Sequence, residues 1–279
     1  MRFGVSTHLY HDRRLERDHL VQIAGYGFEA IELFATRSHF DYHDQGTIDR
    51  LKHWLEETGL TLNSVHAPIT ERFGSGDQWA PTYSNAATDK SVREAAVRET
   101  EAALRVADSI PFDVLVVHLG TPASRARAGD NHRGSAVRSF EEISDLAVRR
   151  GVRVAVEVIP NGLSDAASLA ALLDQDLDAR HAGICLDFGH AHRMEDVVDA
   201  IEAASEHIIA THVHDNRGRD DAHLVPGLGT IDWSAALMTM RKIGYAGTYV
   251  MELANTGTPG AVLDGARRAR QRFERALAD

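Results

Sequence analysis

Short apolar runs alternate with amphipathic segments along the whole chain. The runs cover residues 2–7, 30–34, 62–67, 114–120, 153–159, 183–189, 208–214 and 248–253. Their length and their content of β-branched residues predict buried strands. Intervening segments such as 91–108 and 139–151 carry apolar residues at three- and four-residue spacing, which predicts helices. The second of these ends in "RRG", and basic residues followed by glycine are typical of a helix end.

The alternation predicts one α/β domain over residues 1–279, a (β/α)8 TIM barrel. Strands that alternate with helices pair in parallel, and eight units of about 35 residues match the usual size of this fold. A doubly wound open sheet is the alternative. It would carry a glycine-rich phosphate turn after the first strand, and "GVSTHLYHD" (4–12) has none.

Histidines and carboxylates stand at the ends of most of the predicted strands. They are His66, His118, Glu157, Asp187 with His190 just beyond it, His212 with His214, and Glu252. The carboxyl ends of the strands form the active-site face of a TIM barrel. A carboxylate between apolar neighbours, as in "VAVEVIP" and "VMELA", is costly to bury without a cation or donor. The set therefore predicts a divalent metal site.

The stretch "THVHDN" (211–216) leaves the number of its metal ligands open. Residues two apart on a strand share a face, so His212 and His214 lie on the same side. They could supply one ligand, two ligands, or a packed pair of imidazoles. His8 ends the first run, and Glu32 interrupts the second. His8 has no strong partner in the sequence and is interpreted as a hydrogen-bonded residue of the barrel mouth. Glu32 could support a ligand or form an ion pair at the rim, and it stays unassigned.

The longest gap between predicted strands runs from 67 to 113. Its first part, "PITERFGSGDQWAPTYSNAATD", mixes glycine, proline and aromatic residues. Long ordered loops in compact domains are more often functional than idle. Trp79 and Tyr83 are therefore candidates for the substrate wall; alternatively, they pin the loop to the barrel rim.

The net charge of −11 disfavours a surface that neutralises phosphates, which counts against nucleic acid as a partner. Cys185 is the single cysteine, so a reducing compartment is expected. No apolar run is long enough for a secretion signal or a membrane span. We therefore expect a cytoplasmic protein without membrane contact, and its oligomeric state stays open.

Seven motifs, in order, resemble the xylose isomerase-like TIM-barrel superfamily, which holds sugar isomerases, epimerases and the endonuclease IV type of abasic-site nuclease. They are "VHAP" (65–68), "VVHLG" (116–120), "VEVIP" (156–160), "LDFGH" (186–190), "HVHD" (212–215), "DAHLVPGLGTIDW" (221–233) and "MEL" (251–253). One position departs from the pattern. Many relatives carry an acidic residue where this chain has Leu228.

The resemblance implies a ligand set. The epimerase branch implies one divalent ion (Mn, Zn, Co or Mg) on Glu157, Asp187, His212 and Glu252. The nuclease branch implies up to three zinc ions, and it adds the residues matching His66, His118, His190, Asp221 and His223. His214 is at a position that varies among relatives, so it is interpreted as a substrate contact or as a support for a ligand.

The leading functional hypothesis is isomerisation or epimerisation of a small sugar, ketose or related polyol-carbonyl compound, phosphorylated or not. Such chemistry moves a proton through an enediolate and needs an electrophile and positioned bases. Glu157 and Glu252 are the expected proton carriers. The expected substrate contacts are His190, His214, Trp79 and Arg217, with Arg219 as a second arginine on the same loop. Alternatively, the two arginines are solvated loop residues.

Two other functions compete. The first is metal-assisted hydrolysis of a phosphodiester at abasic sites, which the nine matching positions favour and the negative charge disfavours. The basic segment "RRARQR" (267–272) belongs to the final predicted helix, where it would lie on the barrel exterior. The second is a sugar-binding barrel without turnover. Two apolar-flanked carboxylates argue against it, because binding alone does not need them.

Overall fold

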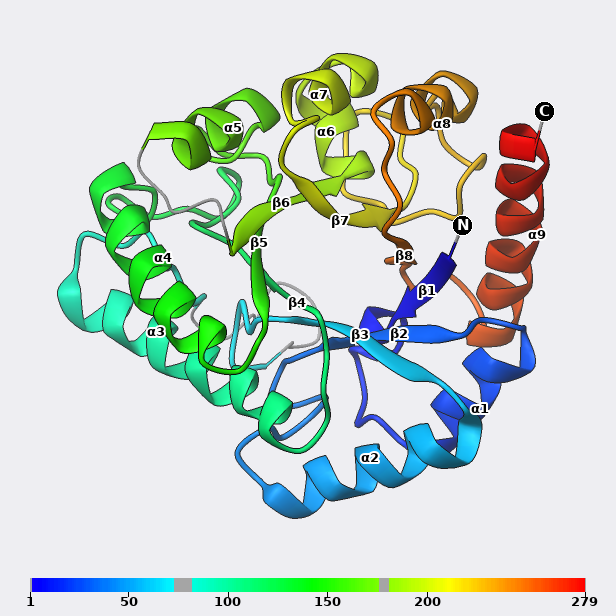
Figure 1. The fold of residues 1–279 in the computed structure, drawn as a ribbon, viewed down its shortest axis with the longest axis horizontal. Helices are drawn as coiled ribbons and strands as arrows, with labels where there is room; N and C mark the ends of the chain where they lie inside the picture. Colours follow the sequence, from blue (N-terminus) through cyan, green and yellow to red (C-terminus); the bar gives the residue numbers. More distant parts are fainter. Residues whose placement is uncertain (1, 73–81, 176–180, 279) are drawn as a thin grey trace.

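The computed structural model describes residues 2–72, 82–175 and 181–278, and these form a closed barrel of parallel strands in the order β1 to β8 (Figure 1). The strands are β1 (Arg2–Ser6), β2 (Ala30–Phe34), β3 (Thr61–His66), β4 (Val114–Val117), β5 (Arg153–Glu157), β6 (Ala182–Asp187), β7 (Ile208–Val213) and β8 (Thr248–Met251). β1 pairs with β8, which closes the sheet. The prediction of a (β/α)8 TIM barrel is confirmed.

The helices surround the barrel (Figure 1). They are α1 (Arg17–Gly25), α2 (Gln45–Thr58), α3 (Lys90–Leu104), α4 (Arg133–Val148), α5 (Ala166–Gln175), α6 (Phe188–Met194), α7 (Val197–Ala203), α8 (Trp233–Lys242) and α9 (Pro259–Ala278). Two 3-10 turns accompany them, η1 (Thr7–Tyr10) and η2 (Arg105–Asp108). The helix predicted over 91–108 is therefore α3 continued by η2. Within the described residues, no helix is long and apolar enough to cross a membrane.

Local capping explains where several helices begin and end. Asp44 accepts a hydrogen bond from the backbone of Thr47 at 2.9 Å, and Gly59 ends α2 in the left-handed conformation at φ 71°. Helix α4 begins at Arg133, six residues before the segment that the apolar spacing predicted. It begins early because His132 caps it, accepting from the backbone N–H of Ser135 at 3.2 Å.

The apolar core has two parts. The larger part lies between the sheet and the surrounding helices. A small cluster of Val114, Val116, Ala155, Cys185 and Ala210 belongs to β4–β7. These side chains lie on the same strand faces as the polar strand-end residues, so they form an apolar layer inside the barrel beneath its mouth. Burial raises the pKa of the Cys185 thiol, which keeps it protonated.

The polar side chains of the mouth lie at the strand ends or one to three residues beyond them. Glu157 and Asp187 end β5 and β6, His118 follows β4, and Glu252 follows β8. The Asp187 carboxylate also caps α6, accepting from the backbone N–H of His190 at 2.7 Å. The short helix α6 therefore brings His190 back over the mouth.

Candidate metal centre and active site

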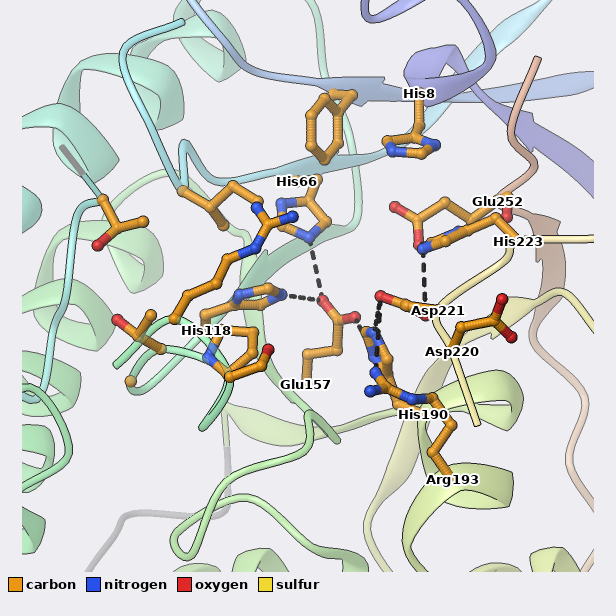
Figure 2. Close-up of a pocket in the computed structure, with 18 of the residues that line it drawn as sticks. His8, His66, His118, Glu157, His190, Arg193, Asp220, Asp221, His223 and Glu252 are labelled. Atoms are coloured by element: carbon orange, nitrogen blue, oxygen red, sulfur yellow. Dashed lines mark hydrogen bonds and ion pairs between the residues drawn. The ribbon is translucent and has the colours of Figure 1, made fainter. Parts of the chain in front are cut away.

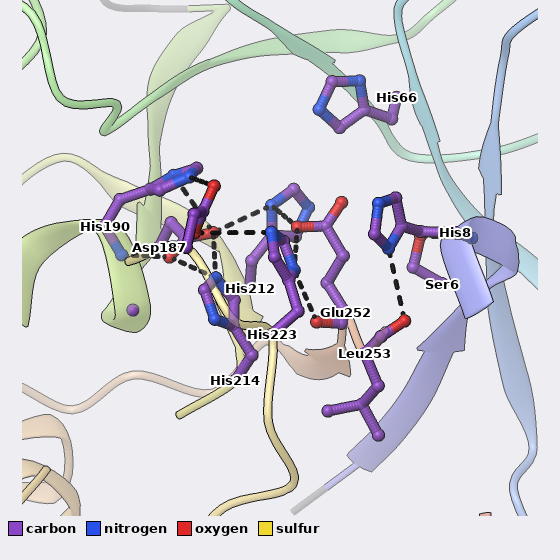
Figure 3. A network of polar contacts seen from close by, with 12 residues as sticks. Ser6, His8, His66, Asp187, His190, His212, His214, His223, Glu252 and Leu253 are labelled. Carbon is purple, nitrogen blue, oxygen red and sulfur yellow. Dashed lines mark hydrogen bonds and ion pairs between the residues drawn. The ribbon is translucent and has the colours of Figure 1, made fainter. Parts of the chain in front are cut away.

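Glu157, Asp187, His212 and Glu252 meet at one point on the floor of the barrel mouth. Each offers a ligand atom, and these atoms lie within 4.8 Å of one another. His212 Nδ1 is 3.3 Å from Glu157 Oε1, 3.5 Å from Glu252 Oε2 and 3.7 Å from Asp187 Oδ2. Figure 3 shows His212, Asp187 and Glu252 converging. All four side chains are buried. The structure thus brings together the residues that the epimerase branch implies.

The chemistry of this cluster fits a divalent cation. Burial opposes the ionisation of Glu157, but the imidazoles of His118 and His212 hold its pKa well below the usual value. His190 and His214 lower the pKa of Asp187 in the same way, again against burial. His212 Nδ1 is buried and has no hydrogen-bond partner among the described residues. A buried ring nitrogen that faces ionised carboxylates is the arrangement that a metal ion completes.

Glu32 determines which nitrogen of His212 faces the cluster. His212 Nε2 donates to Glu32 Oε2 at 3.1 Å, and the same oxygen accepts from Ser64 Oγ at 2.9 Å. Nε2 therefore carries a proton, and Nδ1 points toward the carboxylates. Burial opposes it, but the surrounding anionic groups raise the pKa of His212 well above its usual value, so a proton is favoured on Nδ1 as well, and a bound metal ion would replace that proton. Glu32 is fully buried. The sequence signal for this role was a carboxylate inside the apolar run "AIELF", which had no partner nearby in the chain.

His66, His118 and Glu157 form a second cluster beside the first. The Nε2 atoms of His66 and His118 lie 3.0 and 2.9 Å from Glu157 Oε2 (Figure 2). The Nδ1 of His66 faces the carbonyl oxygen of Ala67 at 2.8 Å and donates to it. In neutral His66 the Nε2 lone pair then faces a carboxylate oxygen. Either a second proton or a cation must lie between them.

The third cluster consists of His190, Asp221 and His223, together with the fully buried His214. The Nδ1 atoms of His190 and His223 face the carbonyl oxygens of Val158 and Glu252 at 3.0 and 2.9 Å. Their Nε2 atoms lie 3.1 and 3.5 Å from Asp221 (Figure 2). Burial lowers the pKa of His223, but the neighbouring Asp221 carboxylate outweighs this effect and raises the pKa to about 9. The nine positions implied by the nuclease branch thus occupy three adjacent groups.

A cavity of about 410 Å³ opens above the three clusters. Glu157, Glu252, His66, His118, His190, Asp221 and His223 all line it, together with His8 and Tyr83. Arg125, Arg193 and Arg219 line it as well. Figure 2 shows Glu157 and Glu252 pointing into it from different sides. The cavity is large enough for a small sugar in contact with the carboxylates.

The structure separates the predicted substrate contacts. His190 lines the cavity, and so does Tyr83. Trp79 lies outside the described residues. Arg217 does not line the cavity; its exposed side chain donates to the carbonyl oxygen of Leu228 at 3.3 Å. The neighbouring Arg219 lines the cavity in its place.

His214 does not line the cavity, and of its two expected roles, substrate contact or support for a ligand, its contacts favour the second. It is fully buried, donates through Nε2 to Asp187 at 3.1 Å and stacks on His223 with ring centroids 3.9 Å apart. The reason is that β7 ends at Val213, and the chain then turns around the buried Asp215, whose carboxylate accepts from Trp233 Nε1 at 2.9 Å. His214 therefore supports Asp187.

His8 lines the cavity and is hydrogen-bonded at the barrel mouth, as its place at the end of the first run indicated. Its Nδ1 donates to the carbonyl oxygen of Leu253 at 3.2 Å, and its ring stacks on His223 with centroids 4.8 Å apart (Figure 3). The sequence did not identify these partners, because they lie at the other end of the chain.

Comparison of the sequence with known proteins finds a matching protein family and related enzymes. The model of the xylose isomerase-like TIM-barrel family matches residues 20–275. L-ribulose-5-phosphate 3-epimerase UlaE of Salmonella paratyphi A is 24% identical over 242 residues, 86% of this chain and 81% of that one.

Solved structures agree with this placement. D-psicose 3-epimerase with D-tagatose from Clostridium cellulolyticum H10 superposes with a TM-score of 0.78 at 21% identity, covering 99% of both chains. The IOLI protein with a binding zinc atom superposes with a TM-score of 0.76 at 16% identity, covering 98% of both. At these identities the superpositions establish the fold.

Proposed function

Because this chain belongs to the xylose isomerase-like TIM-barrel family, we propose that it is a divalent-metal-dependent isomerase or epimerase of a small sugar or ketose. Sugar epimerases among its relatives support an enzyme of this kind. The observation that carries the proposal is the convergence of Glu157, Asp187, His212 and Glu252 on the cavity floor. The reaction would remove a proton beside a carbonyl and return it through an enediolate.

The four residues of the central cluster would hold the ion. When bound, a divalent ion supplies the electrophile that stabilises negative charge on the substrate oxygens. Manganese, zinc, cobalt and magnesium all suit a mixed nitrogen and oxygen ligand set. The clusters around His66 with His118 and around Asp221 could bind further ions.

The two glutamates differ in how they are held. Glu157 Oε2 lies 3.0 Å from His66 Nε2 and 2.9 Å from His118 Nε2, and Oε1 lies 3.4 Å from His190 Nδ1, so both of its oxygens are engaged. The contacts of Glu252 with His212 and His223 are closest through Oε2, and Oε1 makes no hydrogen bond within the described part of the chain. An acceptor for a substrate proton needs a free lone pair. Glu252 is therefore the better placed proton carrier, and Glu157 orients the site.

Exchange of substrate protons with solvent tests the proposal directly. We expect the metal-loaded protein to incorporate deuterium beside the carbonyl of at least one ketose in a panel. Glu252→Gln should slow this by about 10²- to 10⁴-fold, the usual contribution of a general base. Metal content, measured by elemental analysis, shows whether the variant still holds its ion. The exposed Glu206→Gln is the control. Absence of exchange with every sugar, in protein shown to hold metal, would refute the proposal.

Phosphodiester hydrolysis is the second candidate, favoured by one observation. Glu157 belongs to two of the three clusters, so ions in both would share a carboxylate, as in multinuclear hydrolytic sites. The net charge of −11 opposes it. The basic segment 267–272 lies on α9, where Arg270 and Arg272 donate to the carbonyl oxygens of Gly27 and Pro226. Phosphodiester hydrolysis would become the first candidate if the protein bound three zinc ions per chain, incised an abasic duplex and exchanged no ketose protons.

A further inference from the structure

His8 differs from the other imidazoles of the cavity in what its Nε2 atom faces. Among the described residues, five histidines line the cavity (Figure 2). In four of them Nε2 lies 2.9 to 3.5 Å from a carboxylate oxygen of Glu157 or Asp221; these are His66, His118, His190 and His223. The Nε2 of His8 makes no hydrogen bond or ion pair within residues 2–72, 82–175 and 181–278. His8 is therefore the imidazole of this set whose second nitrogen stays available to a ligand.

The contacts of His8 assign its hydrogen to Nδ1. This atom lies 3.2 Å from the carbonyl oxygen of Leu253, which can only accept, so Nδ1 carries the hydrogen (Figure 3). Within the described part of the chain no carboxylate lies at ion-pair distance from the ring, so nothing there stabilises a second hydrogen on Nε2. An imidazole without an anionic partner is neutral at pH 8, because its usual pKa is about 6.5. The Nε2 atom of His8 is then an uncharged hydrogen-bond acceptor.

Three neighbouring rings hold the imidazole of His8 in place. It stacks on His11 and on His223, with ring centroids 4.5 and 4.8 Å apart, and it meets Phe34 edge-on with centroids 4.9 Å apart. The stacked rings fix the plane of the imidazole, and the hydrogen bond to Leu253 fixes its direction. The acceptor is therefore oriented before a ligand arrives, and an oriented group loses little conformational entropy on binding.

The chemistry of this acceptor selects a hydroxyl group. A lone pair on an uncharged nitrogen binds a hydrogen-bond donor, and it does not bind a carbonyl, carboxylate or ionised phosphate oxygen, which are acceptors. The donors of a ketose are its hydroxyl groups. The reacting oxygens of the substrate would lie at the central cluster, to which His8 does not belong. The hydroxyl at His8 is therefore on a carbon outside the enediolate.

We propose that His8 is a specificity-determining residue, which accepts a hydrogen bond from one hydroxyl group of the substrate on a carbon outside the enediolate. The protein then prefers a ketose with a free hydroxyl at that carbon to the same ketose without the hydroxyl hydrogen. This inference rests on the proposed function, since it assigns a substrate contact in the same site.

Analogues that differ at a single hydroxyl group test the inference. Solvent proton exchange and kcat/KM are measured at pH 8 with metal-loaded protein for D-fructose, D-psicose and D-tagatose, and for their deoxy and deoxyfluoro analogues at carbons 4, 5 and 6. At one of these carbons we expect both analogues to lose about 3- to 10-fold in kcat/KM, the effect of one neutral hydrogen bond. The two losses should be equal, because fluorine and hydrogen alike leave His8 without a donor.

Two variants of His8 separate the acceptor from the rest of the ring. His8→Gln can place an amide oxygen near the position of Nε2, whereas His8→Asn can place an amide N–H near that of Nδ1, toward Leu253. We expect His8→Asn to lose the preference for the hydroxyl and His8→Gln to keep it in part. His53→Asn, the same change on the exposed side of α2, is the control and should keep it fully. A preference that persists in His8→Asn, or that is lost equally in both variants, overturns the inference.

Binding separates failure of this inference from failure of the proposed function. Calorimetry with metal-loaded Glu252→Gln protein measures the affinity for each ketose and analogue without turnover. A preference for the hydroxyl that is lost in a Glu252→Gln, His8→Asn double variant of unchanged Tm supports the contact whether or not the native protein exchanges protons. Exchange without a preference at any of the three carbons overturns the contact and leaves the proposed function standing. Binding with the preference, but no exchange, overturns only the proposed function. Absence of binding by every ketose overturns both.

Discussion

Replacement of Glu32 by glutamine removes one buried charge from behind His212 and keeps the shape of the side chain. In the native protein the Glu32 carboxylate accepts hydrogen bonds from both His212 and Ser64. His212 lowers the pKa of Glu32 despite its burial, so the group is ionised. The amide oxygen of glutamine can still accept both hydrogen bonds, but it carries no negative charge. It can neither enhance the basicity of the imidazole nor hold the tautomer as firmly.

The size of the effect follows from the geometry. Loss of a carboxylate behind a metal-binding histidine costs about 10- to 100-fold in metal affinity. This corresponds to about 1.4 to 2.8 kcal/mol, since each factor of ten is about 1.4 kcal/mol at 25 °C. Glu32→Gln should fall near the lower end, because its oxygen still accepts. Glu32→Ala should reach the upper end, because the buried Nε2–H of His212 loses its partner.

Competition with a chelator of known affinity measures the dissociation constants for manganese and zinc. The control is Glu29→Gln, the same chemical change at an exposed residue just before β2. Thermal unfolding of the metal-free variants verifies that each is folded. If both Glu32 variants bind metal within about twofold of the native protein, Glu32 does not prepare His212 as a ligand, and the reasoning is refuted.

Three further predictions concern stability. Removal of metal by a chelator should lower Tm, because the buried carboxylates then repel one another without a neutralising cation. Added manganese or zinc should restore Tm. An unchanged Tm after verified removal of the metal contradicts the metal centre. Gly189→Ala should destabilise the fold by about 1 to 3 kcal/mol in denaturant titrations, because its Cβ would lie 2.0 Å from His214 Cε1, whereas Gly25→Ala meets nothing within 4 Å and should be neutral. Burial lowers the pKa of His39 to about 4, below that of the unfolded chain, so the unfolded state binds more protons between these values. His39 should therefore contribute a fall of up to about 3 kcal/mol in the unfolding free energy as the pH drops from about 6.5 to 4, and the His39→Gln protein should lack this contribution when its pH profile is compared with that of the native protein.

The strands and most of the side chains that gather at the barrel mouth were accessible from the sequence. Strand periodicity is local, and parallel strands in a closed barrel all end at one mouth, so His66, Glu157, Asp187 and His212 could be expected to meet before any coordinates were known. A cytoplasmic location, inferred from composition alone, stays a prediction.

Tertiary structure decided the remaining features of the site. Arg219 lines the cavity and His214 does not, because of the way in which the β7–α8 loop folds around Asp215. Asp215 is in turn hydrogen-bonded to Trp233, 18 positions later in the chain. The nitrogen that His212 presents depends on Glu32, 180 positions away. Side-chain period determines the face on which a strand residue lies. It carries no information about hydrogen bonds between distant segments or about the direction of a loop, because those are set by contacts that form only when the barrel closes.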